Sequence, residues 1–541
     1  MTGDAVVRFG GTAFQRALEE RFDRDSGEVL DLSARMCAIQ GVSVPADQSA
    51  FRRLNQTCRL VREFAESRGL RVLHLEPDPD HPFPFVIVTF REHDLAAAGF
   101  DEAVALIGHL DVAPSKHGGQ FSPLLRGVDL YARGAADMKT VVATWLVWMA
   151  RLQQQSGPKP PFVLLLSTCE ENGSHRPHHV RSVLELLQRD YGLTVRFGLV
   201  GARTGELEWM GTDLAVGPVC TENRSWHWYR FAGSGAPGLQ ALERVAMVVK
   251  RWRGMLAELN LRTAGSDRAR RQPGMRSGFI VPFASVAGVP GVEHLENAVT
   301  VRAMREGGRT FHSASADATI SSLLERLAGL AAAAGSVFGR ERVHLAGLRI
   351  GEEGNFNTWD GAGALQLVLS GVGLDEARAW SAGIDEVDIQ VTVRQGSAVR
   401  LESATAVDID MRELLDHHEA MKRHLDQLRA ELGEGESLEL VKYVPPWRCP
   451  ADQPDLVRLL EAYEGVVGEP SPDFVKLHGN DGGNMVAWQH AADRELAARN
   501  EGCAVIFGQV GMDPHGSKEF HRGTSIRPYL DILDRWAASY R

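Results

Sequence analysis

Apolar and polar residues follow helical and strand periods along the first part of the chain. Apolar residues recur every three or four positions where the pattern indicates helices, and form short continuous runs where it indicates strands. The pattern predicts helices over 13–39, 50–67 and 139–154, and strands over 71–76, 84–89, 104–107 and 162–167. The last of these strands is apolar up to Ser167, as in strands covered on both faces. The succession of strand, helix and strand predicts an α/β unit with a mostly parallel central sheet.

The middle of the chain, residues 216–446, has a different pattern and is expected to form a second, α+β domain. Its elements are predicted at 297–304, 317–334, 346–351, 388–412, 417–432 and 437–444. Their order is that of a split βαβ arrangement. Residues 447–541 return to strand, loop and helix, so we expect them to complete the sheet begun by residues 1–215.

Residues 220–296 do not fit that order and are interpreted as an insertion. They contain an aromatic run at 226–231, an amphipathic helix at 239–259 and a basic loop at 267–276. The insertion could shape a substrate pocket, extend a dimer interface or cover apolar surface. Aromatic residues two positions apart more often pack than recognise a ligand, which favours the last of these.

Composition narrows the class of protein. A chain of 541 residues is expected to bury two or more cores. With 44% hydrophobic and 24% charged residues and a net charge of −11, it has the composition of a soluble globular protein, and nothing favours nucleic-acid binding. The six cysteines form no CxxC pair, and no apolar run reaches the length that spans a membrane. We therefore expect a cytoplasmic protein that binds neither nucleic acid nor membrane.

Candidate chemistry begins where the strand at 104–107 runs into Gly-His-Leu-Asp. Residues i and i+2 of a strand point to the same face, so His109 and Asp111 are expected to project together. A metal-bound imidazole usually donates its other N–H to a carboxylate, and Asp111 is placed to accept it. Taken alone, such a pair is more often a buried histidine and a solvated acid, so the remaining acidic residues decide the interpretation.

Three further acidic residues are candidates. Asp137 lies in a run of small residues, and Glu170 with Glu171 comes directly after the apolar strand at 162–167. Adjacent carboxylates at the end of a buried strand repel each other unless a cation lies nearby. One of the pair could bind a metal while the other takes a proton from metal-bound water.

Six segments carry a resemblance to a known family. They are GHLDV (108–112), LYARGAADMKT (130–140), STCEENGS (167–174), GGRTFHSAS (307–315), HGNDGGN (478–484) and DPHGSKEF (513–520). In this order they resemble the motifs of the dinuclear zinc amidohydrolases, which include aminoacylase, acetylornithine deacetylase, succinyl-diaminopimelate desuccinylase, glutamate carboxypeptidase and carnosinase. The resemblance implies a zinc-peptidase-like catalytic domain interrupted by a ferredoxin-like lid that also forms a homodimer.

The resemblance also implies roles for individual residues. The implied metal ligands are His109, Asp137, Glu171 and His515, with Asp137 bridging two metals. Glu170 resembles the general base, Asp111 the residue that orients a histidine ligand, and His312 the lid histidine that reaches the partner subunit's active site and stabilises the oxyanion. Asn355, Asn480 and Asp481 are candidate substrate-binding residues. The donors suit zinc, with cobalt or manganese as alternatives, at up to two ions per subunit.

The sequence departs from the family at one expected ligand. After the strand near 196–200 the family places an acid, and this chain has Ala202. Glu206, Glu208 or Glu222 could substitute only with a different backbone path. If none does, the metal held by His109 lacks one protein ligand and should bind more weakly.

These observations predict metal-dependent hydrolysis of an amide bond in an N-acyl amino acid or small peptide. Two alternatives stay open at this point because of Ala202. A metal-poor relative could form amides or transfer acyl groups, and a non-catalytic relative could only bind its ligand.

Overall fold

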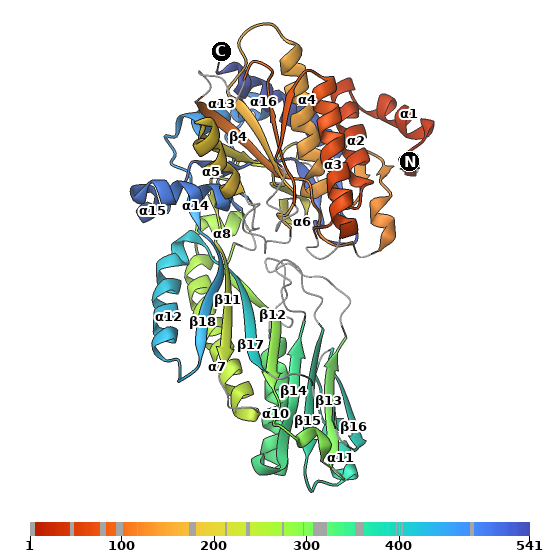
Figure 1. Cartoon of the computed structure of the whole chain (residues 1–541), viewed down its shortest axis with the longest axis vertical. Helices are drawn as coiled ribbons and strands as arrows, with labels where there is room; N and C mark the ends of the chain where they lie inside the picture. Colours follow the sequence, from red (N-terminus) through yellow and green to blue (C-terminus); the bar gives the residue numbers. More distant parts are fainter. Residues whose placement is uncertain are drawn as a thin grey trace. The chain divides into compact units, whose positions relative to one another are not determined.

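The computed structural model divides the chain into two compact units. Unit 1 contains Met1–Arg224, Arg271–Pro273 and Pro445–Arg541, and unit 2 contains Ser225–Arg270 and Gly274–Val444 (Figure 1). The structure describes all residues except 1–5, 44–47, 76–82, 94–100, 116, 172–179, 211–213, 234–237, 273–274, 296, 307–321, 352–361, 387, 397, 400, 402–403, 477–480 and 541. Unit 2 thus begins nine residues after the boundary predicted at 215/216 and ends two residues before the one predicted at 446/447.

The central sheet of unit 1 has the strand order β2-β3-β7-β4-β8-β21. Its strands are β2 (Arg71–Leu75), β3 (Phe85–Thr89), β7 (Phe162–Ser167), β4 (Glu102–His109), β8 (Thr194–Val200) and β21 (Ala504–Ile506). The last four run parallel to one another, whereas β3 pairs antiparallel with β7 and β2 pairs antiparallel with β3. The predicted mixed, mostly parallel α/β sheet is therefore present.

Helices cover both faces of this sheet. The helices of unit 1 are α1 (Thr12–Arg21), α2 (Arg24–Cys37), α3 (Gln48–Ser67), α4 (Thr140–Gln154), α5 (Val180–Tyr191), α6 (Leu207–Met210), α13 (Pro454–Val467), α14 (Gly482–Ala492), α15 (Arg494–Arg499) and α16 (Ile526–Ala538). Val104 and Leu106 of β4 face a core shared with α2, α4 and α16, and Ala105 and Ile107 face a core shared with α5 and α14. Alternate residues of β4 thus pack into two different cores, which explains why the strand is apolar throughout.

The helix predicted over 13–39 is two helices. Asp23 begins the second one, because its carboxylate accepts hydrogen bonds from the backbone amides of Asp25 and Ser26, both at 3.1 Å. A side chain that satisfies free amides in this way starts a new helix. The periodicity on either side of Asp23 was correct, and the break depends on this cap.

Two smaller sheets complete unit 1. Their strands are β1 (Val6–Arg8), β5 (Leu124–Arg126), β6 (Asp129–Tyr131), β23 (Phe520–Arg522), β22 (Val510–Met512) and β9 (Gly205–Glu206), followed by β19 (Trp447–Arg448), β10 (Glu222–Asn223) and β20 (Val475–Lys476). The pairing of β6 with β23 brings the segment after Tyr131 next to the segment before Phe520. These two segments carry Asp137 and His515.

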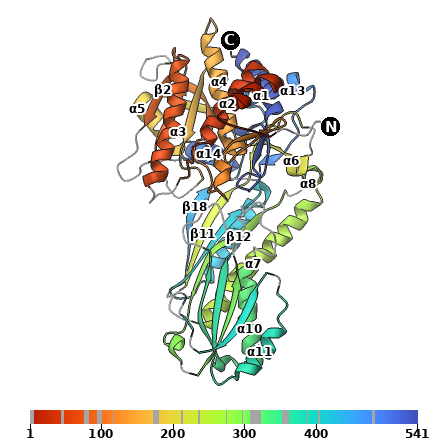
Figure 2. The same ribbon diagram turned by 90° about the vertical axis from the view of Figure 1, so that its right-hand side faces the viewer.

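Unit 2 contains one antiparallel sheet of eight strands in the order β16-β13-β15-β14-β12-β17-β11-β18. Its strands are β11 (Trp226–Gly233), β12 (Gly278–Ala287), β13 (Val299–Arg305), β14 (Val343–Ile350), β15 (Gly363–Leu369), β16 (Gln390–Gln395), β17 (Thr405–Arg412) and β18 (Ser437–Val444). Its helices are α7 (Leu239–Ala264), α8 (Asp267–Arg271), α10 (Leu323–Phe338), α11 (Leu374–Ala382) and α12 (His418–Ala430). Figure 2 shows α7 and α10, which contact each other, against the same side of the sheet.

The strand order shows the same six-element arrangement twice. In chain order, β11-α7-β12-β17-α12-β18 forms one half of the sheet, and β13-α10-β14-β15-α11-β16 forms the other. In each half the strands lie in the order fourth, first, third, second. The second set is inserted between β12 and β17 of the first.

This arrangement corrects the interpretation of residues 220–296. They are not additional material beside the domain, because β11, α7 and β12 are half of the outer set. Tyr229, Phe231 and Trp252 belong to the core of unit 2, as the packing interpretation of the aromatic run requires. The predicted strand at 388–412 is two strands, β15 and α11 were not predicted, and the basic loop contains α8.

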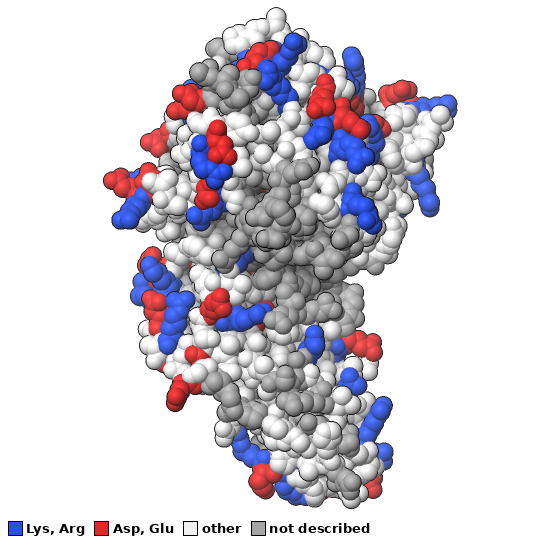
Figure 3. All heavy atoms as spheres, viewed as in Figure 1, with Lys and Arg blue, Asp and Glu red and all other residues white. Residues whose placement is uncertain are grey.

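The described residues contain no helix long and apolar enough to cross a membrane. On the face drawn in Figure 3, Lys and Arg side chains are interspersed with Asp and Glu in each unit, and the described residues form no broad patch of one sign there.

Candidate metal centre

His109 is the last residue of β4, where it lies opposite Ser167, the last residue of β7. The imidazole is buried, and its Nδ1 lies 3.1 Å from the backbone oxygen and 3.4 Å from Oδ1 of Asp111. Both oxygens of Asp111 can therefore act as acceptors for an Nδ1–H. This contact leaves Nε2 of His109 as the nitrogen that faces the remaining candidate ligands.

Asp111 also fixes the turn that carries the paired glutamates. Its fully buried carboxylate accepts hydrogen bonds from the backbone amides of Glu170 (3.3 Å) and Glu171 (3.0 Å), and from the hydroxyl of Ser43 (2.8 Å). One acidic side chain thus positions an imidazole and two carboxylates at the carboxyl ends of β4 and β7. This edge of a parallel sheet is where open α/β proteins bind their ligands.

The carboxylate of Asp137 lies between the imidazoles of His109 and His515. Its Oδ1 is 3.3 Å from Nε2 of His109, and its Oδ2 is 3.5 Å from Nε2 of His515. The same nitrogen of His515 lies 3.1 Å from Oε1 and 3.0 Å from Oε2 of Glu171. Asp137, Glu171 and His515 offer donor atoms within 4.8 Å of one another, and so do His109, Glu170 and Glu171. We call these five residues the unit 1 centre.

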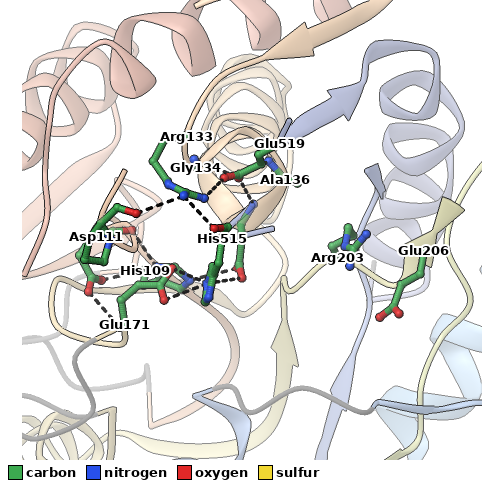
Figure 4. A network of polar contacts seen from close by, with 12 residues as sticks. His109, Asp111, Arg133, Gly134, Ala136, Glu171, Arg203, Glu206, His515 and Glu519 are labelled. Carbon is green, nitrogen blue, oxygen red and sulfur yellow. Dashed lines mark hydrogen bonds and ion pairs between the residues drawn. The ribbon is translucent and has the colours of Figure 1, made fainter. Parts of the chain in front are cut away.

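A buried ion pair supports the segments that carry Asp137 and His515. Arg133 donates a hydrogen bond to Oε2 of Glu519 (2.6 Å) and another to the backbone oxygen of His515 (3.0 Å). Oε1 of Glu519 accepts from the backbone amides of Gly134, Ala136 and Asp137 at 2.9, 3.1 and 3.2 Å (Figure 4). Glu519 therefore holds the loop that presents the bridging carboxylate.

The carboxylates favour a positive charge on both imidazoles. Burial lowers the pKa of His515, but the charges of Glu171 and Asp137 raise it to about 10. Burial likewise lowers the pKa of His109, and contacts with Asp111 and Asp137 raise it well above its usual range. The same surroundings stabilise a bound cation, because the negative potential that attracts protons also attracts metal ions.

Glu170 differs from the other carboxylates of the centre. Burial raises its pKa well above the usual range; His109 opposes this shift, and the neighbouring charge of Glu171 adds to it. A carboxylate with a raised pKa can hold a proton near neutral pH, which a general base requires.

The donor set fits a divalent cation. Imidazole nitrogens and carboxylate oxygens are the ligands of zinc and of other borderline to hard divalent metals, and no cysteine takes part in either group. The paired oxygens of Asp137, one facing each imidazole, suit a carboxylate shared between two ions.

The position expected to supply a further acid holds Ala202 after β8, and the described residues provide no substitute in the cluster. Glu206 forms a buried ion pair with Lys476 at 3.0 Å, and Figure 4 shows it away from the cluster. Glu222 pairs with Arg448 at 2.6 Å. The side chain of Glu208 lies outside the described residues.

Of the three candidate substrate-binding residues, the structure describes Asp481. Asp481 is buried at the end of β7, where its Oδ2 accepts a hydrogen bond from Ser167 at 2.9 Å. Burial raises the pKa of Asp481, whereas His109 and the bond from Ser167 oppose the shift. His312, Asn355 and Asn480 lie outside the described residues.

The supporting residues were not predicted from the sequence. Arg133 and Glu519 lie in two of the six resemblance segments, but nothing in the local pattern assigns them to each other across 386 positions. The sequence did contain one signal. Arg133 and Glu519 each lie close to small residues, and a charged side chain that is buried there requires a partner.

Comparison with known proteins gives a family match over most of the chain. Residues 105–539 match the model of "Peptidase family M20/M25/M40". The succinyl-diaminopimelate desuccinylase of Thiobacillus denitrificans is 35% identical over 114 residues, which are 20% of this chain and 29% of that enzyme. The match to this curated relative therefore spans less than a third of its length.

Solved structures are similar over nearly the whole chain. Human carnosine dipeptidase 1 has a TM-score of 0.48 at 12% identity and covers 97% of this chain and 98% of its own. The M20 family metallo-carboxypeptidase Sso-CP2 from Sulfolobus solfataricus has a TM-score of 0.48 at 12% identity, with 96% and 99% covered.

Proposed function

Because the chain belongs to the peptidase family M20/M25/M40, as the motifs indicated, we propose that it hydrolyses an amide bond in an N-acyl amino acid or a small peptide. The observation that supports this most strongly is the meeting of His109 and His515 at the two oxygens of Asp137. Side chains far apart in the sequence converge there beside Glu170, the carboxylate that the proposal assigns to proton transfer. A protein that only binds its ligand does not require a base such as Glu170 beside the metal ligands.

His515, Glu171 and Asp137 would hold one divalent cation, and His109 with Asp137 the other. Zinc is the first candidate, with cobalt and manganese next. When bound, such a cation polarises a carbonyl and lowers the pKa of a coordinated water towards neutrality. Asp111 keeps His109 in the required tautomer and holds the turn of the paired glutamates.

Glu170 is proposed as the general base. It would take a proton from the attacking water and return it to the departing amine nitrogen, which converts the amine into a good leaving group. Its half-buried position beside Glu171 supports this role, since desolvation raises its pKa. His312 is proposed to stabilise the oxyanion, and Asn355, Asn480 and Asp481 to contact substrate.

Unit 2 is proposed to be the lid and to mediate a homodimer. The strand order of each of its halves, with helices after the first and third strands, supports a ferredoxin-like arrangement. Light scattering of the full chain would measure the oligomeric state, with the mass of two chains as the expected result.

The absence of an acid at Ala202 supports one rival function. A centre with a weak or missing second metal could form an amide or transfer an acyl group instead of hydrolysing one. The rival and the proposal differ in metal content and in the reaction with simple amides. One ion or none per unit 1 centre, together with inert amides, would favour the rival.

A substrate screen tests the proposal. The full chain, supplied with zinc, cobalt or manganese, is incubated with N-acetyl and N-succinyl amino acids and with dipeptides, and release of the free amine is measured. We expect at least one class to be cleaved in a metal-dependent way by the wild type and not by Glu170→Gln. Equal rates in the two proteins would show that the activity does not arise at this centre.

A further inference from the structure

A second group of metal-ligand side chains lies within unit 2. It consists of His227 on β11, Glu413 directly after β17 and His418 at the start of α12, which we call the unit 2 cluster. One donor atom from each lies within 4.8 Å of the others. Glu413 is 0% exposed and His227 is 3% exposed, whereas His418 is half-buried. The donor atoms of the two groups in the unit 1 centre also lie within 4.8 Å of one another.

Two buried atoms of the cluster have no hydrogen-bond partner among the described residues. Nε2 of His227 lies 2.9 Å from Oε1 of Glu413, but the two groups are not aligned as a hydrogen bond, and Oε2 of Glu413 has no partner. Leaving such atoms unsatisfied in the interior costs about 1–3 kcal/mol each in proteins generally. Nε2 of His227 and Oε2 of Glu413 face the same small region. Nδ1 of His418 also faces it, and lies 2.5 Å from Oε1 of Glu413.

No Lys or Arg forms an ion pair with Glu413 in the part of the chain that the structure describes. Arg412 and Lys442, which are nearby in the sequence and the sheet, lie over the ring of Trp226 at 4.0 and 3.5 Å from its centroid. Among the described residues, the groups of opposite charge type that approach the Glu413 carboxylate are the imidazoles of His227 and His418.

The surroundings of His227 are those of a metal ligand. Its Nδ1 lies 3.0 Å from the hydroxyl oxygen of Tyr229, whose side chain is buried. An Nδ1–H that donates to this oxygen leaves the lone pair of Nε2 directed at Glu413. Ligating histidines generally donate their second N–H to such an oxygen.

The backbone holds Glu413 in place independently of its side chain. The amide of Ser225 donates to the backbone oxygen of Glu413 (2.9 Å), and the amide of Glu413 donates to the hydroxyl of Ser225 (3.2 Å). The donor geometry is therefore built by the sheet and the first turn of α12, not by a mobile side chain.

We propose that His227, Glu413 and His418 bind one divalent transition-metal ion that is separate from the unit 1 centre. Two imidazoles and one carboxylate are ligands of zinc and also of iron(II), with a further position left for water. The ion would join three segments of unit 2, namely β11, the end of β17 and the start of α12. Its role is to hold these segments together, since the unit 2 cluster has no spare carboxylate to act as a base.

The test uses the full chain with the substitutions Asp137→Asn and His515→Ala, which remove ligands of the unit 1 centre. This protein is loaded with Zn²⁺ alone or with Fe²⁺ alone under anaerobic conditions, and the metal per chain is measured after dialysis. We expect one ion per chain to be retained. Adding Glu413→Gln or His418→Gln should reduce this to none, and the matched control His424→Gln, a histidine of the same helix outside the cluster, should retain it.

X-ray absorption of the retained ion provides a measurement without any substitution in unit 2. Two imidazoles and oxygen donors in its first coordination sphere are expected. A background protein that is folded by circular dichroism but retains no ion would overturn the proposal, because the cluster would then be an ion pair neutralised by a protonated histidine. Retention that persists in both Glu413→Gln and His418→Gln would also overturn it, because the ion would lie elsewhere.

Discussion

The unit 1 centre and the unit 2 cluster contain the same kinds of donor in opposite proportions. The first has three carboxylates for two imidazoles, and the second has one carboxylate for two imidazoles. In unit 1, Glu170 has a raised pKa and is the carboxylate that we propose as the base. In unit 2 every donor is needed to hold an ion. The comparison teaches that the surplus carboxylate, more than the presence of metal ligands, distinguishes a centre that can react from one that can only bind.

The most severe test of this difference removes the surplus carboxylate. Glu170→Gln should lower kcat by about 10²–10⁴-fold, because proton transfer by a positioned base contributes that much. The metal content should stay at the wild-type value. Steady-state rates and metal analysis of the same preparation measure both quantities.

The matched control for this prediction is Glu185→Gln. Glu185 is 51% exposed on α5, where it pairs with Arg181 on the surface, and such pairs contribute little to stability. Its kcat should equal that of the wild type. A Glu170→Gln protein as active as this control would remove the distinction between the two clusters.

A smaller effect is expected when the support of the unit 1 centre is weakened. Glu519→Gln would place an amide group against Arg133 or against the three amides of the loop that carries Asp137. Changing such supporting residues typically lowers metal affinity or activity by about 10–100-fold. Competition with a chelator would measure the affinity. Wild-type affinity in this variant would show that Glu519 does not position Asp137.

The smallest effect concerns the pH dependence of the metal-free chain. Burial lowers the pKa of His515, but Glu171 and Asp137 raise it to about 10, above the value near 6.5 expected in the unfolded chain. A raised pKa contributes stability that is fully present below about pH 6.5 and is lost as the pH rises through about 10. The melting temperature of the metal-free chain should therefore fall over this range.

Zinc should change the sign of this dependence. Protons compete with the metal for the imidazoles, so the stabilisation by zinc should increase with pH over the same range. Thermal melts with and without zinc at several pH values measure both trends. Parallel curves would contradict the assignment of His515 as a ligand.

The edge of the unit 1 sheet was predictable because its signals are local. The run 104–107 ends directly in His109, and the run 162–167 ends close to Glu170 and Glu171. Parallel strands place such ends at one edge of the sheet. The convergence of His515 on Asp137 depends on the pairing of β6 with β23, which no local pattern encodes.

Unit 2 was predicted less well for a physical reason. The repeated arrangement of six elements is carried by strand pairing, whereas the two halves share no obvious sequence pattern. Thus β11 and β12, separated by α7, were interpreted as an insertion. His227, Glu413 and His418 were missed because they lie 186 and 5 positions apart and meet only through adjacent strands.

Anomalous diffraction at the zinc absorption edge tests the central claim most directly. In crystals of the full chain grown with zinc, we expect anomalous density at the carboxylate of Asp137, between the imidazoles of His109 and His515. Two peaks would lie about 3.5–4 Å apart, as in other two-metal centres. Ordered side chains at these three residues with no anomalous density among them would contradict the account.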